Sequence, residues 1–282
     1  MFKHIQIPPS FSLIQKGKVS LLLKEEYKNL LLEQGIDDLK TFLKKSSQNF
    51  HYLKGRTLHP SIPLEDGKRM VFRRYSHGGL LRSITGNLYL FAMRSFRELA
   101  LTEEILSCGI PTIQPIGAIH HRIFFPFYQA YFLSLEVPRA KDLIQYFQEI
   151  GQNLLQKRKT IRSAGLLVRQ FHQVGFFHGD LQLKNILVAG DQLLLIDFDR
   201  SFRKPTLSIE ERMKNLLRLN RSVEKWKRLG LPITRTDRWR FFLSYAGEDK
   251  EIEEAMQRVL RTYWLRFLFY RFGWKLQKIV GS

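Results

Sequence analysis

The sequence has little of several residue types that would restrict its fold or its location. Its 282 residues include one cysteine, Cys108, which excludes an internal disulfide and a zinc site built on cysteines. The chain begins Met1-Phe2-Lys3-His4, without a charged segment followed by an apolar one, so we expect no secretory leader and a reducing cytoplasm. No apolar run approaches the about 20 residues that span a bilayer.

Acidic residues are also scarce. The chain holds 26 Asp and Glu against 46 Lys and Arg, a formal net charge of +20. Such an excess predicts an anionic partner, which could be nucleic acid, acidic lipid or a polyanionic substrate. The basic residues are spread along the chain, so composition does not choose among these partners. The 44% hydrophobic and 13% aromatic residues indicate a folded globular protein.

The most specific pattern lies in residues 178–199. The segment His178-Gly179-Asp180-Leu181-Gln182-Leu183-Lys184-Asn185 precedes an apolar run at 186–188. A Gly-Asp turn follows, and then a second apolar run that ends in Asp197-Phe198-Asp199. Two short apolar runs around such a turn predict a β-hairpin with polar groups at both ends.

The spacing of these polar groups is typical of a kinase catalytic loop followed by its metal-binding aspartate. We expect Asp180 to take or orient the proton of an attacking hydroxyl, and Asn185 and Asp197 to hold Mg²⁺ at the phosphates of ATP. Lys184 is either a phosphate or substrate contact or a solvated loop residue.

The residues before position 109 offer candidates for holding the nucleotide. Arg73 occupies the position of the strand lysine that binds the α- and β-phosphates, with Lys68, Arg69 and Arg74 as competitors. Glu98, on a helix expected at 91–108, is the candidate partner of that cation, and Glu103 and Glu104 are alternatives. Gly55 and Arg56 lie where a glycine-rich loop would cover the phosphates, although a plain β-turn explains one glycine equally well.

These elements predict an α+β, protein-kinase-like fold with two lobes. The N-terminal lobe, residues 1–136, would hold an antiparallel sheet and one main helix, with residues 1–50 as an extension. The mostly helical C-terminal lobe would span 137–282, and the backbone of Glu136 and Val137 at the hinge would meet the adenine. We expect helices at 25–43 (with a break at 35–37), 142–155, 161–177 and 209–229. Residues Leu166, Leu167, Phe171 and Phe176 are expected in the core, and His172 is expected to be a core or supporting residue.

The last aromatic and basic helix, at 263–275, is open to two interpretations. Its aromatic residues suit either the core of the C-terminal lobe or a membrane interface that faces acidic lipid.

The motifs together resemble the lipopolysaccharide core kinases, which phosphorylate 3-deoxy-D-manno-octulosonic acid (Kdo) or heptose. The resemblance covers roughly residues 50–230. Its residues are His178 to Val188, Leu195 to Arg200, Val71 to Tyr75 with His77-Gly78-Gly79, Phe96-Arg97-Glu98, Gly109-Ile110-Pro111 and Asn215 to Ser222. Asp-Phe-Asp and an arginine in the strand-lysine position fit the Kdo kinases better than protein kinases.

The resemblance implies an enzyme that uses ATP and Mg²⁺ to phosphorylate a sugar hydroxyl of lipid A-core. It also implies peripheral contact with the anionic inner membrane on its cytoplasmic face, and no nucleic acid partner. Three alternatives stay open. A protein kinase would need a longer segment after Asp199, a kinase of small cationic substrates would prefer an acidic site, and an inactive lipid-binding module would not need Asp180, Asn185 and Asp197.

Overall fold

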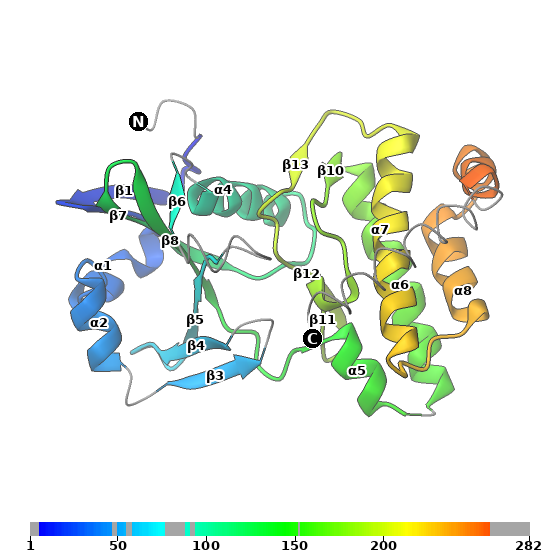
Figure 1. Cartoon of the computed structure of the whole chain (residues 1–282), viewed down its shortest axis with the longest axis horizontal. Helices are drawn as coiled ribbons and strands as arrows, with labels where there is room; N and C mark the ends of the chain where they lie inside the picture. The colour runs from blue at the N-terminus through cyan, green and yellow to red at the C-terminus, as the bar shows by residue number, and fades with distance from the viewer. Residues whose placement is uncertain are drawn as a thin grey trace, which may run out of the picture.

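An antiparallel sheet and a group of helices occupy opposite ends of the molecule in the computed structural model (Figure 1). The structure describes residues 6–46, 50–54, 58–76, 88–90, 94–151 and 153–259. The helix expected at 263–275 lies outside these residues. Within the described part, no helix is both long and apolar enough to cross a bilayer.

The large sheet has the strand order β1-β2-β7-β8-β5-β4-β3, and β6 pairs with β8. Its strands are β1 (Phe11–Lys16), β2 (Val19–Lys24), β3 (His51–Lys54), β4 (Leu58–Pro63), β5 (Arg69–Arg74), β6 (Tyr89–Leu90), β7 (Pro115–Phe124) and β8 (Phe127–Leu135). Within the expected N-terminal extension, residues 11–24 therefore belong to this sheet, because β1 and β2 extend it beyond β7.

Helices cover both faces of the sheet. Alternate residues of a strand point to opposite faces, so Leu21 and Leu23 pack with α1 (Glu25–Glu33) and α2 (Leu39–Ser46), whereas Leu22 joins the cluster that includes α4 (Arg94–Ser107). The predicted main helix is α4. The pair α1 and α2 adds a second covered face, and the expected break at 35–37 lies between these two helices.

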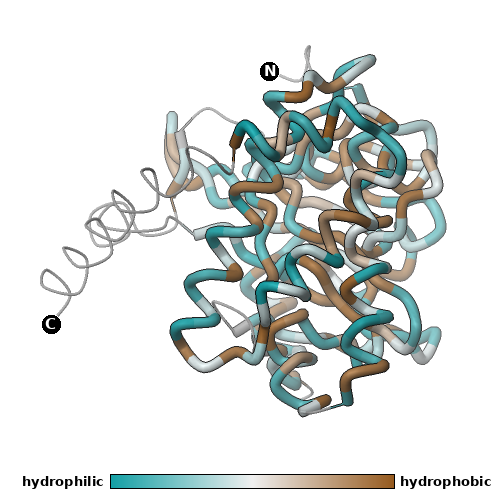
Figure 2. Tube along the Cα trace, turned by 90° about the vertical axis from the view of Figure 1, so that its right-hand side faces the viewer, coloured by the Kyte–Doolittle hydropathy of each residue, from teal (hydrophilic) through white to brown (hydrophobic). Residues whose placement is uncertain are grey.

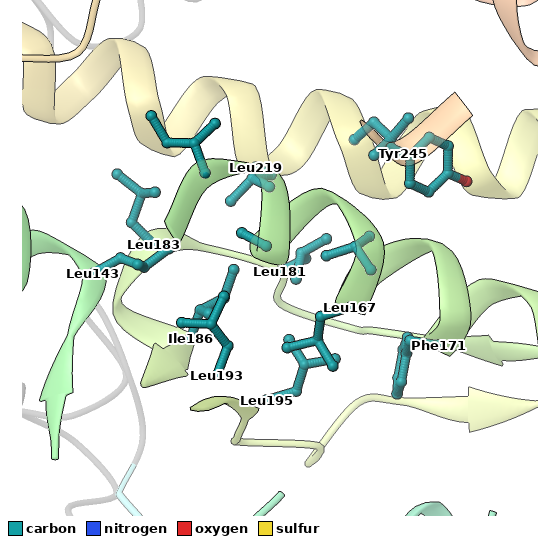
Figure 3. Packing of buried hydrophobic residues seen from close by; sticks show 14 of the residues in the cluster. Leu143, Leu167, Phe171, Leu181, Leu183, Ile186, Leu193, Leu195, Leu219 and Tyr245 are labelled. Carbon is teal, nitrogen blue, oxygen red and sulfur yellow. The ribbon is translucent and has the colours of Figure 1, made fainter. Parts of the chain in front are cut away.

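The other end of the molecule is mainly helical. It contains α5 (Leu143–Glu149), α6 (Leu154–Gln173), α7 (Ile209–Arg228), α8 (Arg235–Ala246) and a further helical stretch at 250–259. Along the trace in Figure 2, hydrophobic and hydrophilic stretches alternate on these helices. Their apolar faces enclose a core that includes Leu167, Phe171 and Leu219 (Figure 3).

The predicted hairpin is present between these two ends. It consists of β11 (Ile186–Ala189) and β12 (Gln192–Leu195), and β9 (Lys141–Asp142) pairs with β11. A short pair, β10 (Phe176–Phe177) and β13 (Phe202–Arg203), lies beside it, and the 3-10 turn η2 (Leu183–Asn185) precedes it. The hairpin therefore connects the catalytic-loop sequence to Asp197 as expected.

Three local predictions are wrong. The helix expected at 161–177 ends at Gln173, because Gly175 adopts a φ of 90° and Phe176–Phe177 form strand β10. Residues 142–155 form two helices, because α5 ends at Glu149 and Gly151 adopts a φ of 53° before Asn153 caps α6. Leu166 is 52% exposed, since it lies on the solvent face of α6, whereas Leu167, Phe171 and Phe176 are buried as predicted. The lobe boundary at residue 136 stays a prediction.

Candidate active site

A neutral hydrogen-bond network fixes the start of the catalytic loop. The side-chain amide of Asn215, on α7, accepts a bond from the His178 backbone N–H and donates to the His178 carbonyl, both at 3.0 Å. His172 Nε2 lies 3.1 Å from the same amide oxygen, and His172 Nδ1 lies 2.8 Å from the Tyr245 hydroxyl. His172 is thus a buried supporting residue, as predicted.

The two histidines of this network are uncharged at neutral pH. Burial lowers the pKa of His172 to about 4, and it does the same for His178. The His178 ring lies 3.1 Å from the Ile196 carbonyl oxygen through Nε2, and its Nδ1 accepts from the Asp180 N–H at 3.0 Å. One ring therefore joins the residue before Asp197 to the backbone of Asp180.

The Asp180 side chain is ionised and paired. Its Oδ1 accepts bonds from the Arg218 guanidinium, at 2.8 Å from Nε and 2.5 Å from Nη2, and from the Gln182 amide. Lys184 Nζ lies 3.9 Å from Oδ2. Burial opposes ionisation, but the Gln182 and Arg218 bonds outweigh it and hold the pKa of Asp180 below its ordinary value. The carboxylate can therefore receive or orient a hydroxyl proton at neutral pH.

The two predicted metal ligands offer hard oxygen donors side by side at the open end of the hairpin. Asn185 is buried, and its Nδ2 donates to the Asp180 carbonyl at 2.7 Å, which directs its Oδ1 away from that bond. Asp197 adopts a φ of 69° and accepts from Arg73 through Oδ1 at 2.8 Å, while no partner of its Oδ2 occurs among the described residues. Amide and carboxylate oxygens are the donors that Mg²⁺ prefers, so the pair fits this ion.

Arg73 forms the centre of a charged network. It lies on β5, and its Nη2 donates to Glu98 Oε1 on α4 at 2.5 Å while its Nη1 reaches Asp197. Glu98 is 2% exposed and also accepts from the Tyr75 hydroxyl. Burial raises the pKa of Glu98 despite the neighbouring Arg73. At Asp197 burial also opposes ionisation, but the charge of Arg73, its hydrogen bond and the charge of Lys184 together lower the pKa. Of the basic and acidic residues that the sequence offered for the cation–glutamate pair, Arg73 and Glu98 are the two that form an ion pair with each other.

The remaining predicted nucleotide contacts have mixed positions. The Glu136 N–H donates to the Arg69 carbonyl at 2.8 Å, and the Glu136 carboxylate lies 3.5 Å from Arg69 Nε. Because this N–H is already bonded, an adenine would have to use neighbouring backbone groups, including those of Val137. Lys184 stands beside Asp180. Gly55 and Arg56 lie outside the described residues. The roles of all these residues stay predictions.

Residues 215–222 were included in the family resemblance, but the sequence gave none of them a role at the site, where the structure places several. Asn215 and Ser222 are polar positions within the buried face of α7, which otherwise carries Met213, Leu216, Leu219 and Val223. Buried polar residues on an apolar helix face need partners, and that signal could have assigned Asn215 to the catalytic loop. The contact of Arg218 with Asp180 had no comparable local signal.

Comparisons with known proteins agree with this geometry. Residues 40–245 match the model of the lipopolysaccharide kinase (Kdo/WaaP) family. A 3-deoxy-D-manno-octulosonic acid kinase of Pasteurella multocida is 31% identical over 195 residues, which cover 66% of this chain and 79% of that one. The enzyme of that name from Vibrio vulnificus strain CMCP6 is 34% identical over 162 residues, covering 55% and 65%.

The fold has a solved counterpart. A structure described as WaaP in complex with acyl carrier protein superimposes with a TM-score of 0.55 over 91% of this chain and 98% of that chain. At 18% identity this match shows the fold alone. The protein-kinase-like α+β fold predicted from the sequence is thereby confirmed.

Proposed function

The chain belongs to the lipopolysaccharide kinase (Kdo/WaaP) family, and we propose that it transfers the γ-phosphoryl group of ATP to a hydroxyl of Kdo in lipid A-core. As a member of that family it is a phosphotransferase that acts on a sugar hydroxyl of a glycolipid. The observation that carries the proposal is the convergence of Asp180, Asn185, Asp197 and Arg73 at the open end of one hairpin, opposite its turn.

In the proposed reaction, Asp180 orients the acceptor hydroxyl and takes its proton. The hydroxyl oxygen forms a bond to the γ-phosphorus, the bond from that phosphorus to the bridging oxygen breaks, and ADP leaves. Asn185 and Asp197 would hold Mg²⁺, which when bound neutralises charge on the phosphates. Arg73 is held between Glu98 and Asp197, so its fixed guanidinium can bind phosphate oxygens without reorganisation.

Kdo is favoured over heptose as the acceptor by the relatives named Kdo kinase. Kdo carries a carboxylate, and the net charge of +20 suits such an anionic glycolipid. The same charge supports our further proposal that the protein acts as a peripheral protein at the anionic cytoplasmic face of the inner membrane, where this substrate would be presented.

The test offers labelled ATP and Mg²⁺ to the full chain with Kdo-lipid A, a heptosylated core whose remaining Kdo hydroxyls are chemically blocked, and a basic protein in parallel. We expect label on Kdo-lipid A, and Asp180→Asn should lose it while retaining Mg·ATP binding. Label only on the heptosylated core would overturn the choice of sugar. Label only on protein, or ATP binding without transfer, would overturn the proposed function in favour of a protein kinase or an inactive lipid-binding module.

A further inference from the structure

An ion pair outside the residues assigned so far joins α4 to the metal-binding loop. Arg94, the first residue of α4, donates from Nε to Asp199 Oδ1 at 2.9 Å and from Nη2 to Asp199 Oδ2. Asp199 stands where protein kinases have the glycine of Asp-Phe-Gly. The bond is bidentate, which fixes the relative orientation of the two side chains as well as their distance.

This pair lies in a sheltered setting. The side chains of Arg94 and Asp199 are 25% and 18% exposed, and the Arg94 guanidinium lies 4.8 Å from the centre of the Tyr89 ring. The helix dipole disfavours a cation such as Arg94 at the first turn of a helix. The first turn of α4 contains no acidic residue, so the negative charge beside Arg94 comes from Asp199. Burial reduces solvent screening, so this pair should be stronger than an exposed one.

Two sets of ion pairs therefore link the same face of α4 to Asp197-Phe198-Asp199. Glu98 follows Arg94 by four residues, which places both on one side of the helix. Asp197 is joined to Glu98 through Arg73, and Asp199 is joined to Arg94 directly. The C-terminal end of α4 is already anchored, because the Pro111 carbonyl accepts from the Leu195 N–H at 3.1 Å. The Arg94 pair thus fixes the end of the helix that is far from this backbone connection.

The segment after Asp199 is itself held against the catalytic loop. A Cβ on Gly179 would lie 2.3 Å from the Arg200 carbonyl oxygen, so only glycine allows this approach. The Gly179 N–H donates to Ser201 Oγ at 3.0 Å. In protein kinases the cation–glutamate pair and the metal aspartate must both be in place, and phosphorylation of the activation loop controls this. Here unmodified side chains supply both connections.

We propose that Arg94 and Asp199 are positioning residues that hold α4, and with it Glu98 and Arg73, in the arrangement needed for phosphoryl transfer without covalent activation. The inference rests on the proposed function. If the pair acts as a unit, removing either partner should displace the phosphate-binding arginine, and displacements of this kind cost up to about 10²-fold in rate.

The test compares Arg94→Met, Asp199→Asn, their double variant and the conservative Arg94→Lys. We expect kcat per folded molecule to fall by about 10- to 100-fold in each single variant, with the double variant no worse than either single one. Arg94→Lys should recover part of the loss, because it keeps the charge but not the bidentate bond. Phosphatase-treated wild type should keep full activity.

A matched control lies on the same two elements. Arg203 and Glu104 also join the segment after Asp199 to α4, but their side chains are 40% and 42% exposed and lie near the anchored end of the helix. Arg203→Met should change kcat less than about threefold, as expected of an exposed pair. An equal loss in Arg203→Met, or additive losses in the double variant, would overturn the proposal.

Amide hydrogen exchange separates this inference from the proposed acceptor. Exchange in residues 97–101, whose amides are bonded within the first turns of α4, should speed up in Arg94→Met and Asp199→Asn but not in Arg203→Met, and this measurement needs no acceptor. Unchanged exchange would contradict a positioning role. If exchange is faster in these variants but the wild type does not phosphorylate Kdo-lipid A, the proposed function is overturned, whereas the positioning role of Arg94 and Asp199 stands.

Discussion

Two networks meet at the active site, and they are built from different interactions. The network around Asn215, His172 and His178 is buried and neutral, and it holds the backbone of the catalytic loop. The network around Arg73, Glu98 and Asp197 is charged, and it joins a strand, a helix and the loop that holds Asp197. Neutral bonds therefore fix the scaffold, whereas the charges gather where we propose that phosphates and metal bind.

The largest effect is expected from removing the central charge. Arg73→Met should lower kcat/KM by about 10²- to 10³-fold, the loss typical of removing one fixed electrostatic contact. Steady-state kinetics with Mg·ATP would measure it. Arg74→Met is the matched control, because Arg74 is the next residue of β5 and its exposed side chain points to the other face of the sheet. A similar loss in both variants would show that general positive charge, and not the network, binds the phosphates.

The neutral network should show its largest effect in stability. Asn215→Leu leaves the buried N–H and carbonyl of His178 without partners, at about 1–3 kcal/mol for each unsatisfied group. Chemical denaturation should therefore show a loss of about 3 kcal/mol in the free energy of unfolding. Asn220→Leu, on the same helix but half-buried, should cost less. Equal losses would contradict the scaffold role of Asn215.

Acid should weaken the neutral network as the pH falls below the ordinary pKa of histidine. The folded-state pKa of His172 is about 4 against an ordinary 6.5, so between these values the unfolded chain binds a proton that the folded chain does not. Stability from this group is complete above pH 6.5 and is lost as the pH falls toward 4, by at most about 1.4 kcal/mol per pH unit. His172→Gln should reduce the slope of unfolding free energy against pH in that window. An unchanged slope would show that His172 is protonated when folded.

The smallest expected effect concerns the acid limb of the pH–rate profile. Arg218 helps to hold the pKa of Asp180 below its ordinary 3.8, so removing this cation favours the protonated carboxyl. Arg218→Met should move the acid limb of kcat/KM to higher pH, with little change near pH 8. A profile that does not move would mean that Asp180 is not the group whose protonation limits the reaction.

The sequence predicted elements whose signal is local. The Gly-Asp turn between two apolar runs specified the hairpin, and its flanking Asp180, Asn185 and Asp197 followed from spacing alone. Strand alternation requires Arg73 and Arg74 to lie on opposite faces of β5. Local patterns did not separate α5 from α6, because the apolar positions continue across the loop that contains Gly151.

Contacts between distant segments were beyond such patterns. Arg218 meets Asp180 only because α7 packs against the catalytic loop, and Arg94 meets Asp199 across 105 residues of sequence. A solvent-exposed arginine and one that pairs with a catalytic carboxylate look alike on a helix. The candidate chemical groups could therefore be named from the sequence, whereas the residues that hold them in place required the structure.

The most direct test of the account is the mass spectrum of Kdo-lipid A after incubation with the full chain, Mg²⁺ and ATP, with fragmentation to locate any added phosphate. The account predicts one phosphate on the Kdo residue with wild-type protein, and none with Asp180→Asn at equal Mg·ATP binding. Unmodified glycolipid with both proteins, or equal modification by both, would contradict it.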